Sequence, residues 1–160
     1  MSKSGAHKKA FEFTSGEEFE PSELYVTKEF NNNYLHAVED LNTRYTEHTT
    51  NYSPVIHPGL LINYSNITRS PSFYLPSGMA AIHTHEEIHF LEPGRLERRL
   101  TITWKVVESY EKRGRPYQVV NSSITDEQQG KIILLQPRHY LSGLRGQTKP
   151  GEDFSIRPFS

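Results

Sequence analysis

A carboxylate, an amide and a phenol follow one another closely in the segment AVEDLNTRYTEH, residues 37–48. They belong to Asp40, Asn42 and Tyr45. A carboxylate can take a proton from water, and an amide or a phenol can hold that water by a hydrogen bond. The spacing predicts either a site for a reacting water or the polar end of an amphipathic helix. The residues by themselves leave both interpretations open.

A second chemical pattern lies in HTHEEIHFLEPG, residues 83–94. Four side chains have the same parity and would share one face of a strand: His83, His85, Glu87 and His89. Imidazoles two residues apart on a strand can bind one divalent metal together with a carboxylate. The pattern is similar to the first metal motif of cupins, although His89 occupies the usual glutamate position and no second cupin motif follows. A cupin-like metal protein is therefore an alternative to an exposed or interface-facing strand.

Composition restricts the partners of the chain. Its 160 residues predict one domain. With 18 basic and 19 acidic side chains, it lacks the excess of positive charge that would attract nucleic acid or an anionic membrane surface. The absence of cysteine excludes disulfides, thiolate metal sites and a cysteine nucleophile. Residues 1–9 are polar and basic without an apolar run, and no later stretch approaches the roughly 20 apolar residues of a membrane span. We expect a soluble, cytoplasmic protein.

Two helices are predicted in the first half of the chain. Thr27 is a plausible N-cap, and apolar residues then recur at steps of three and four until a helix end near residues 42–43: Phe30, Tyr34, Ala37, Val38, Leu41 and Tyr45. The second helix opens at Pro58 and Gly59 and has an apolar stripe of Leu60, Leu61, Tyr64 and Ile67. It is short, so other elements must wrap it.

From Met79 onward the apolar period changes to two, which predicts strands. We expect them over residues 82–90, 100–107, 117–125 and 131–140, with EKRGRP interrupting the run and DEQQG forming a hairpin turn. Helices followed by an antiparallel meander predict an α+β domain over residues 11–141, with tails at 1–10 and 142–160. Such a sheet has open edges, so we expect pairing with a second copy or a homologous subunit.

These residues resemble a known family. The stretch from IHTHEEIHFLEPG to KIILLQ looks like the C-terminal strand region of MaoC-like hydratase/dehydratase proteins, especially their N-terminal-dehydratase branch. The likeness comprises a His that opens a strand, Glu-x-x-Phe-x-x-Pro, a long strand ending in YEKRGRPY, and the hairpin from Asp126 to Gly130. Upstream, IHPGLL resembles the start of the family's central helix. Over residues 20–140 the resemblance implies the hot-dog fold, a long antiparallel sheet wrapped around a central helix.

In active members the resemblance implies the motif Asp-x-Asn-Pro-x-His after the first helix. Its Asp and His deprotonate a water that adds across the double bond of an enoyl thioester, and the reverse reaction dehydrates a 3-hydroxyacyl thioester. Here Tyr45 stands in the His position, and a phenol with a pKa of about 10 is a poorer base than an imidazole near about 6.5. Either Asp40 works with His57 or His48 brought close in space, or the chain is the non-catalytic, thioester-binding subunit of a two-hot-dog dehydratase.

The leading hypothesis is a hydro-lyase that needs neither a cofactor nor a metal. Its predicted catalytic residues are Asp40, Tyr45 and His57. The predicted substrate-binding residues are Asn42, Gly59, His83, Arg113 and Arg115. The resemblance places the thioester oxygen at the Gly59 backbone and His83 near the acyl tunnel, and the two arginines could bind the phosphates of coenzyme A or of a carrier protein's phosphopantetheine. The predicted partners are an acyl-CoA or acyl-carrier-protein thioester and a second hot-dog subunit, in a homodimer or a heterodimer.

Overall fold

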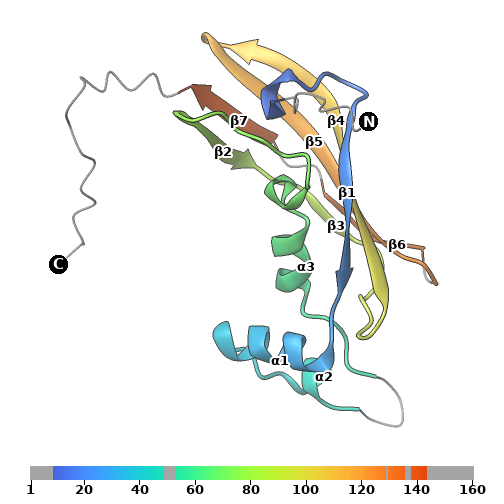
Figure 1. Ribbon diagram of the computed structural model, residues 1–160. Coiled ribbons are helices and arrows are strands. Elements are labelled where there is room, and N and C mark those ends of the chain that lie inside the picture. Colours follow the sequence, from blue (N-terminus) through green and yellow to red (C-terminus); the bar gives the residue numbers. More distant parts are fainter. Residues whose placement is uncertain (1–8, 49–52, 129, 136–137, 144–160) are drawn as a thin grey trace, which may run out of the picture.

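One antiparallel sheet curls around a short helix, α3, in this computed structural model, which describes residues 9–48, 53–128, 130–135 and 138–143 (Figure 1). The strands are β1 Glu18–Tyr25, β2 Met79–His85, β3 Ile88–Phe90, β4 Arg99–Lys112, β5 Arg115–Asp126, β6 Gly130–Leu135 and β7 Arg138–Gly143. The helices are η1 Ala10–Glu12, α1 Lys28–Ala37, α2 Thr43–Thr46, α3 Pro58–Tyr64 and η2 Ile67–Arg69.

The strand order is β1-β4-β5-β6-β3, and β7 pairs with both β5 and β2. Strands β6 and β7 pair with successive parts of β5, so together they form one interrupted strand of the sheet. Strands β3 and β2 pair with β6 and β7 in turn and form a second interrupted strand. The strands predicted over residues 82–90 and 131–140 therefore each correspond to two shorter strands. DEQQG forms the predicted β5–β6 turn, where the Asp126 carboxylate accepts a hydrogen bond from the Gln128 amide at 2.7 Å.

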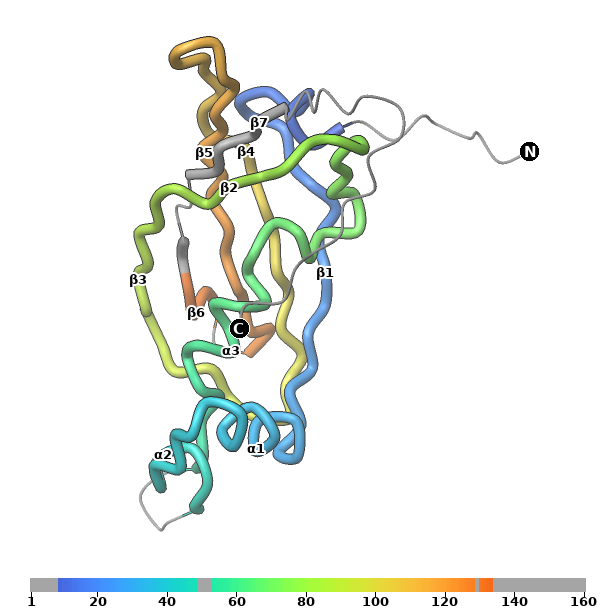
Figure 2. The backbone as a smooth tube through the Cα atoms, turned by 90° about the vertical axis from the view of Figure 1, so that its left-hand side faces the viewer, coloured from blue at the N-terminus to red at the C-terminus, as the bar shows by residue number. Residues whose placement is uncertain are grey.

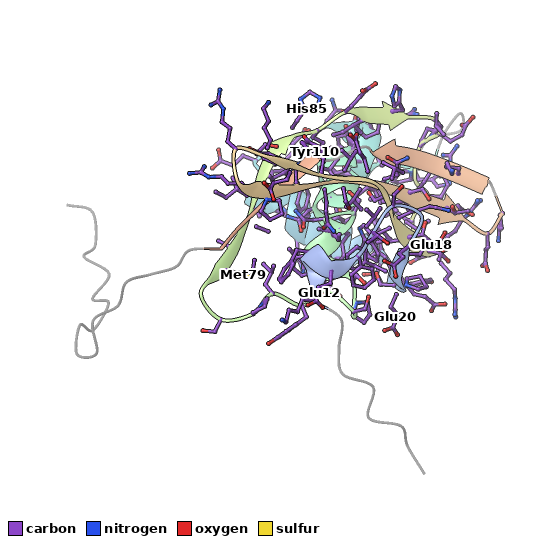
Figure 3. The ribbon with its side chains drawn as sticks, turned by 90° about the horizontal axis from the view of Figure 1, so that it is seen from above. Glu12, Glu18, Glu20, Met79, His85 and Tyr110 are labelled. Carbon is purple, nitrogen blue, oxygen red and sulfur yellow. The ribbon has the colours of Figure 1, made fainter. Side chains whose placement is uncertain are left out.

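The core lies between the sheet and α3. Alternate residues of β4 face this helix and are fully buried: Leu100, Ile102, Trp104 and Val106. From α3, Leu60 and Leu61 are buried against them, and the Trp104 indole donates a hydrogen bond to the Ser65 carbonyl at 2.6 Å. Burying a leucine side chain stabilises the fold by about 1.5–3 kcal/mol. The burial of Leu60 and Leu61 therefore compensates for the low intrinsic stability of so short a helix. The predicted wrapping of this helix is confirmed. Seen from above, β1 with Glu18 and Glu20 lies on one side of α3 and Met79 of β2 on the other (Figure 3).

The alternation rule missed strand β1, whose sequence is EFEPSELY. Phe19 and Leu24 both point into the core, although they are five positions apart. A register shift between Phe19 and Ser22, next to Pro21, changes which face the side chains occupy. A strand with a bulge does not keep period two, so no alternation appears in its sequence.

The first helix is shorter than predicted. The N-cap is correct, since the Thr27 hydroxyl accepts a hydrogen bond from the Phe30 amide at 3.0 Å. However, α1 ends at Ala37, and the remaining members of the predicted apolar stripe leave the helix: Val38 and Leu41 are 44% and 58% exposed. The buried face of α1 instead contains Asn31 and Leu35. The prediction that one helix continues to residue 42 or 43 was wrong because a turn interrupts it.

The described elements reach slightly beyond the predicted domain limits. Ala10 is buried, and its amide donates a hydrogen bond to the Tyr74 carbonyl at 2.8 Å. At the other end, β7 runs to Gly143, which pairs with Met79. Among the residues that the structure describes, no helix is both long and apolar enough to cross a membrane.

The helices α1 and α2 and the β4–β5 hairpin occupy opposite ends of the molecule. Figure 2 shows α1 and α2 at one end of the sheet and the β4–β5 hairpin at the other. This hairpin closes between Lys112 and Arg115, with Arg113 and Gly114 in the left-handed region at φ 55° and 71°. Two residues of positive φ match the twist of paired strands, so EKRGRP is a tight turn between two strands.

Candidate functional site

Asp40 and His57 come together between α1 and α3. The Nε2 atom of His57 lies 3.2 Å from the Oδ2 atom of Asp40, although the residues are 17 positions apart in sequence. The His57 side chain is 17% exposed and that of Asp40 is 41% exposed. The imidazole is thus mostly shielded by protein, whereas the carboxylate is open to water.

A turn after α1 brings Asp40 to this position. The Glu39 amide donates to the His36 carbonyl, and the Asp40 amide donates to the Leu35 carbonyl at 3.1 Å. These are the two hydrogen bonds of a Schellman motif, with Glu39 in the left-handed position at φ 57°. The backbone amide of Asn42 then donates a hydrogen bond to Oδ1 of Asp40 at 3.1 Å. Both oxygens of this carboxylate are therefore held, Oδ1 by Asn42 and Oδ2 by His57.

His57 is the N-cap of α3, and this role determines its tautomer. Its Nδ1 atom accepts a hydrogen bond from the Gly59 amide at 3.0 Å. Because a backbone amide can only donate, Nδ1 carries no proton, and the proton of the neutral ring lies on Nε2. Nε2 therefore donates to the Asp40 carboxylate. Asp40 is held as a hydrogen-bond acceptor, and the imidazole orients it.

Two phenol rings flank the imidazole of His57. The ring centroid of Tyr45 lies 4.8 Å from that of His57, and the centroid of Tyr34 lies at 5.3 Å. Tyr45 comes from α2, where the Asn42 side chain caps the helix by accepting from the Arg44 amide at 2.9 Å. The predicted residues Asp40, Tyr45 and His57 therefore meet in one cluster, and Asn42 and Gly59 support it through hydrogen bonds.

Asn31 joins the segments around this cluster, and sequence reasoning missed it. It is fully buried on α1, and its Oδ1 atom accepts from the His57 amide at 3.1 Å. Its amide nitrogen donates to the carbonyls of Tyr45 and Val55, each at 3.4 Å. The only sequence signal was an asparagine inside an otherwise amphipathic helix, which resembles an ordinary exposed polar residue.

An apolar pocket of about 410 Å³ lies beside the cluster. Tyr45, whose ring packs on the imidazole of His57, and Pro58, which follows His57 in the chain, line this pocket, whereas Asp40 and His57 themselves do not. Its other walls are mainly apolar and include Ile56, Leu61 and Phe90, whereas Arg44 and Glu92 add charge. A pocket of this size with few polar groups suits a small apolar group attached to a polar head.

Other predicted site residues lie elsewhere. Asp40 contacts His57, whereas Nε2 of His48 lies 3.2 Å from the hydroxyl of Ser53. His83 is exposed on β2 and does not line the pocket. Arg113 and Arg115 are exposed in the hairpin at the end of the sheet opposite to α1 and α2 (Figure 2). One chain therefore does not gather these residues around the Asp40–His57 pair.

The His-rich segment is not one continuous strand. It breaks after His85, and β3 begins at Ile88, so the shared parity of the imidazoles does not place them on one strand face. His89 instead lies 2.9 Å from the carboxylate of Glu87, and both side chains are at least half exposed. Within residues 9–48, 53–128, 130–135 and 138–143, no three His, Cys, Asp or Glu side chains are grouped as metal ligands.

Several solved structures share this fold. A MaoC-like dehydratase from Rhodospirillum rubrum is 10% identical, with 85% of this chain and 97% of that chain covered and a TM-score of 0.67. R-hydratase PhaJ1 from Pseudomonas aeruginosa is 15% identical, with 93% of each chain covered and a TM-score of 0.63. A chain of the HadBC complex, a 3R-hydroxyacyl-ACP dehydratase from Mycobacterium tuberculosis, is 12% identical, with 81% and 98% covered and a TM-score of 0.63.

At these identities the likeness establishes the fold. The predicted α+β hot-dog architecture and the resemblance to MaoC-like hydratases and dehydratases are confirmed at that level. The narrower N-terminal-dehydratase branch stays a prediction. No protein-family profile matches the sequence, and no curated protein matches it significantly.

Proposed function

We propose that this chain acts on acyl thioesters, as an enoyl-thioester hydratase or, in the reverse direction, as a 3-hydroxyacyl-thioester dehydratase. The observation that carries the proposal is the Asp40–His57 pair, joined at 3.2 Å beside an apolar pocket of about 410 Å³. The hot-dog fold, shared with a hydratase and two dehydratases, supports the same class of reaction. We further propose that it works in the cytoplasm.

In this proposal Asp40 is the proton acceptor. A water bound to its carboxylate gives up a proton to Asp40 as the water oxygen bonds to the β-carbon of the enoyl thioester. The electrons of the double bond move toward the thioester oxygen and return when the α-carbon takes the proton from Asp40. One water is added in total, and nothing is oxidised or reduced.

His57 holds Asp40 ready for this role. The Nε2–H group of His57 and the Asn42 amide each bind one carboxylate oxygen, which leaves lone pairs for the water. The acyl chain would occupy the pocket lined by Leu61 and Phe90, and Tyr45 would separate it from the imidazole. In this assignment the imidazole missing from position 45 is supplied by His57.

The test is the absorbance change when enoyl-CoA substrates of several chain lengths are hydrated. We expect turnover by the wild type and a loss of about a hundredfold or more in Asp40→Asn, which keeps the shape but not the basic oxygen. Equal turnover by Asp40→Asn removes this carboxylate from the mechanism. Glu87→Gln is the matched control, because its carboxylate also lies beside a histidine, at 2.9 Å, but that histidine is 50% exposed and His57 is 17% exposed.

A second candidate function is binding without turnover, as one subunit of a two-hot-dog dehydratase. Tyr45 favours it, because the motif of active relatives has a histidine there. If the wild type binds acyl-CoA without hydrating enoyl-CoA, and Tyr45→His gains turnover, this second function replaces the first. Tyr45→His also tests whether the ring position next to His57, at 4.8 Å between centroids, suits a catalytic imidazole.

Pairing with another hot-dog subunit is part of the proposal. On the β1 edge, the Glu20 backbone is capped by Ser70 and Ser72, with hydrogen bonds of 2.7 and 2.8 Å. On the other edge, in the described strands β2 and β3, Ile82 and Phe90 are 50% and 54% exposed. An edge with exposed apolar side chains is the better template for a second subunit.

Light scattering tests this edge. We expect the wild type to have about twice the 18.5 kDa mass of one chain, and Ile82→Glu with Phe90→Glu to produce a monomer because charge would be buried in the interface. Tyr25→Glu, a change of equal exposure on β1, should stay dimeric. A monomeric wild type contradicts the proposed homodimer. In a homodimer, the second copy would bring its own hairpin, with Arg113 and Arg115, toward the phosphates of coenzyme A or of phosphopantetheine.

A further inference from the structure

We propose that the hydroxyl of Tyr34 donates the hydrogen bond that binds the thioester oxygen in this site. The inference rests on the proposed function, because it assumes a thioester beside Asp40 and His57. It adds a catalytic residue that the sequence pattern had placed in an apolar stripe. The donor matters because negative charge develops on that oxygen while water adds to the β-carbon.

The backbone donors expected for this role are already used. Pro58 has no amide hydrogen, and the Gly59 amide donates to Nδ1 of His57 at 3.0 Å. The Leu60 amide donates to the carbonyl of His57 at 3.0 Å. A thioester oxygen could bind the Gly59 amide only if it displaced the imidazole, and that would also disturb the hydrogen bond to Asp40.

The Tyr34 hydroxyl lies directly over Gly59. A Cβ atom built on Gly59 would be 2.6 Å from Oη of Tyr34, so only glycine leaves room for the hydroxyl at this place. The Tyr34 ring packs on the imidazole of His57, with centroids 5.3 Å apart and an angle of 46° between the planes. The hydroxyl is therefore fixed beside the same imidazole that orients Asp40.

This hydroxyl is also available to a ligand. Tyr34 is half-buried, and within the described part of the chain its hydroxyl has no hydrogen-bond partner. A phenol that keeps its proton is a good donor to a carbonyl oxygen and a poor base, which suits binding of the oxygen and leaves proton transfer to Asp40. Asp40 and Tyr34 would then act on opposite ends of the conjugated enoyl thioester.

Tyr34→Phe removes only the hydroxyl and keeps the ring packed on His57. For crotonyl-CoA and octenoyl-CoA we expect kcat to fall about a hundredfold, the usual effect of losing one such donor. Tyr64→Phe is the matched control, since Tyr64 is also half-buried but packs edge-on against Phe30, with centroids 5.7 Å apart. It should retain wild-type turnover. Thermal melts of both variants establish that they fold.

A second measurement does not depend on turnover. Butyryl-CoA and octanoyl-CoA, labelled with carbon-13 at the thioester carbonyl, are saturated and cannot be hydrated. Infrared difference spectra should show a lower carbonyl stretching frequency when they bind the wild type or Tyr64→Phe, and no such shift in Tyr34→Phe. A bound carbonyl without a shift in the wild type overturns the assignment of Tyr34, as does failure of these thioesters to bind.

The two measurements separate the two proposals. If the wild type hydrates enoyl-CoA, Asp40→Asn does not, and Tyr34→Phe matches the wild type, Tyr34 is not the donor and the proposed function stands. If the wild type does not hydrate any enoyl-CoA, but the carbonyl shift is present and disappears in Tyr34→Phe, the donor assignment stands and the catalytic function fails.

Discussion

Two histidine–carboxylate pairs in this protein have similar geometry and very different settings. His57 and Asp40 are 3.2 Å apart, are 17 positions apart in sequence, and lie between α1 and α3 with the imidazole 17% exposed. His89 and Glu87 are 2.9 Å apart, are two positions apart in sequence, and are 50% and 57% exposed. The shorter distance thus belongs to the pair with less structure around it.

A short distance between a histidine and a carboxylate therefore does not identify a site. Every atom of the His57 ring that can hydrogen-bond has a defined partner, Gly59 or Asp40, and Asn31 fixes the backbone of His57. A positioned group loses little freedom when it acts on a substrate. The pair of His89 and Glu87 has only a local contact in high dielectric, where an ion pair contributes about 0–1 kcal/mol.

The largest expected difference between the pairs is in turnover. His57→Asn keeps an N-cap side chain for α3 but removes the imidazole that orients Asp40. We expect enoyl-CoA hydration to fall by about a hundredfold, while His89→Asn, the same change in the exposed pair, leaves it within about twofold of the wild type. Steady-state kinetics of both variants measure this. Equal effects would erase the distinction between the pairs.

The next largest effect concerns the support of the buried pair. Asn31→Leu has similar volume but leaves the His57 amide and two carbonyls without their partner. We expect a loss of about 2 kcal/mol in the free energy of unfolding, or roughly 4–8 °C in Tm. Urea and thermal unfolding measure this loss, and Asn33→Leu, an exposed change on the same helix, is the control. A stability equal to that of the control would mean that these hydrogen bonds contribute nothing.

A double-mutant cycle compares the pairs directly. For His57 and Asp40 we expect a coupling in unfolding free energy of up to about 1 kcal/mol, because the pair is partly shielded from water. For His89 and Glu87 the coupling should be close to zero, since both side chains are mostly solvated. Single and double alanine variants of each pair supply the values. A larger coupling for the exposed pair would contradict the role given to burial.

The smallest effect concerns the turn that aims Asp40 at His57. Glu39 occupies a left-handed position at φ 57°, which costs a residue with a side chain about 1 kcal/mol more than glycine. Glu39→Gly should therefore raise the free energy of unfolding by about 0.5–1 kcal/mol and leave turnover unchanged. Chemical unfolding checks the first part and kinetics the second. A destabilised Glu39→Gly variant would show that the side chain matters more than the backbone conformation.

Local signals were enough for much of the fold. The Thr27 cap, the apolar alternation of β4 and the turn from Asp126 to Gly130 each depend on residues close in sequence, and each prediction was confirmed. By contrast, the end of α1 was wrong because the apolar period continues through Val38 and Leu41 while the backbone turns at Glu39. Periodicity reports which side chains could share a face, but not whether the chain stays helical.

For the site, the sequence supplied Asp40, Tyr45 and His57 as candidates with no geometry that joined them. It could not distinguish His57 from His48 as the partner of Asp40, and it gave no reason to single out Asn31 or Tyr34. Their roles depend on contacts between α1, α2 and the start of α3, such as the 3.1 Å hydrogen bond from the His57 amide to Asn31.

Local sequence patterns predicted most of the elements, the family resemblance predicted the hot-dog plan, and the residue types fixed which chemical groups are available. Three features followed from the three-dimensional packing: His57 meets Asp40, its imidazole occupies the Gly59 amide, and the arginine hairpin lies at the other end of the sheet. The two kinds of feature differ in the sequence separation over which their interactions act. Propensity, capping and alternation act over a few residues, whereas a site forms where core packing brings distant segments within hydrogen-bond distance.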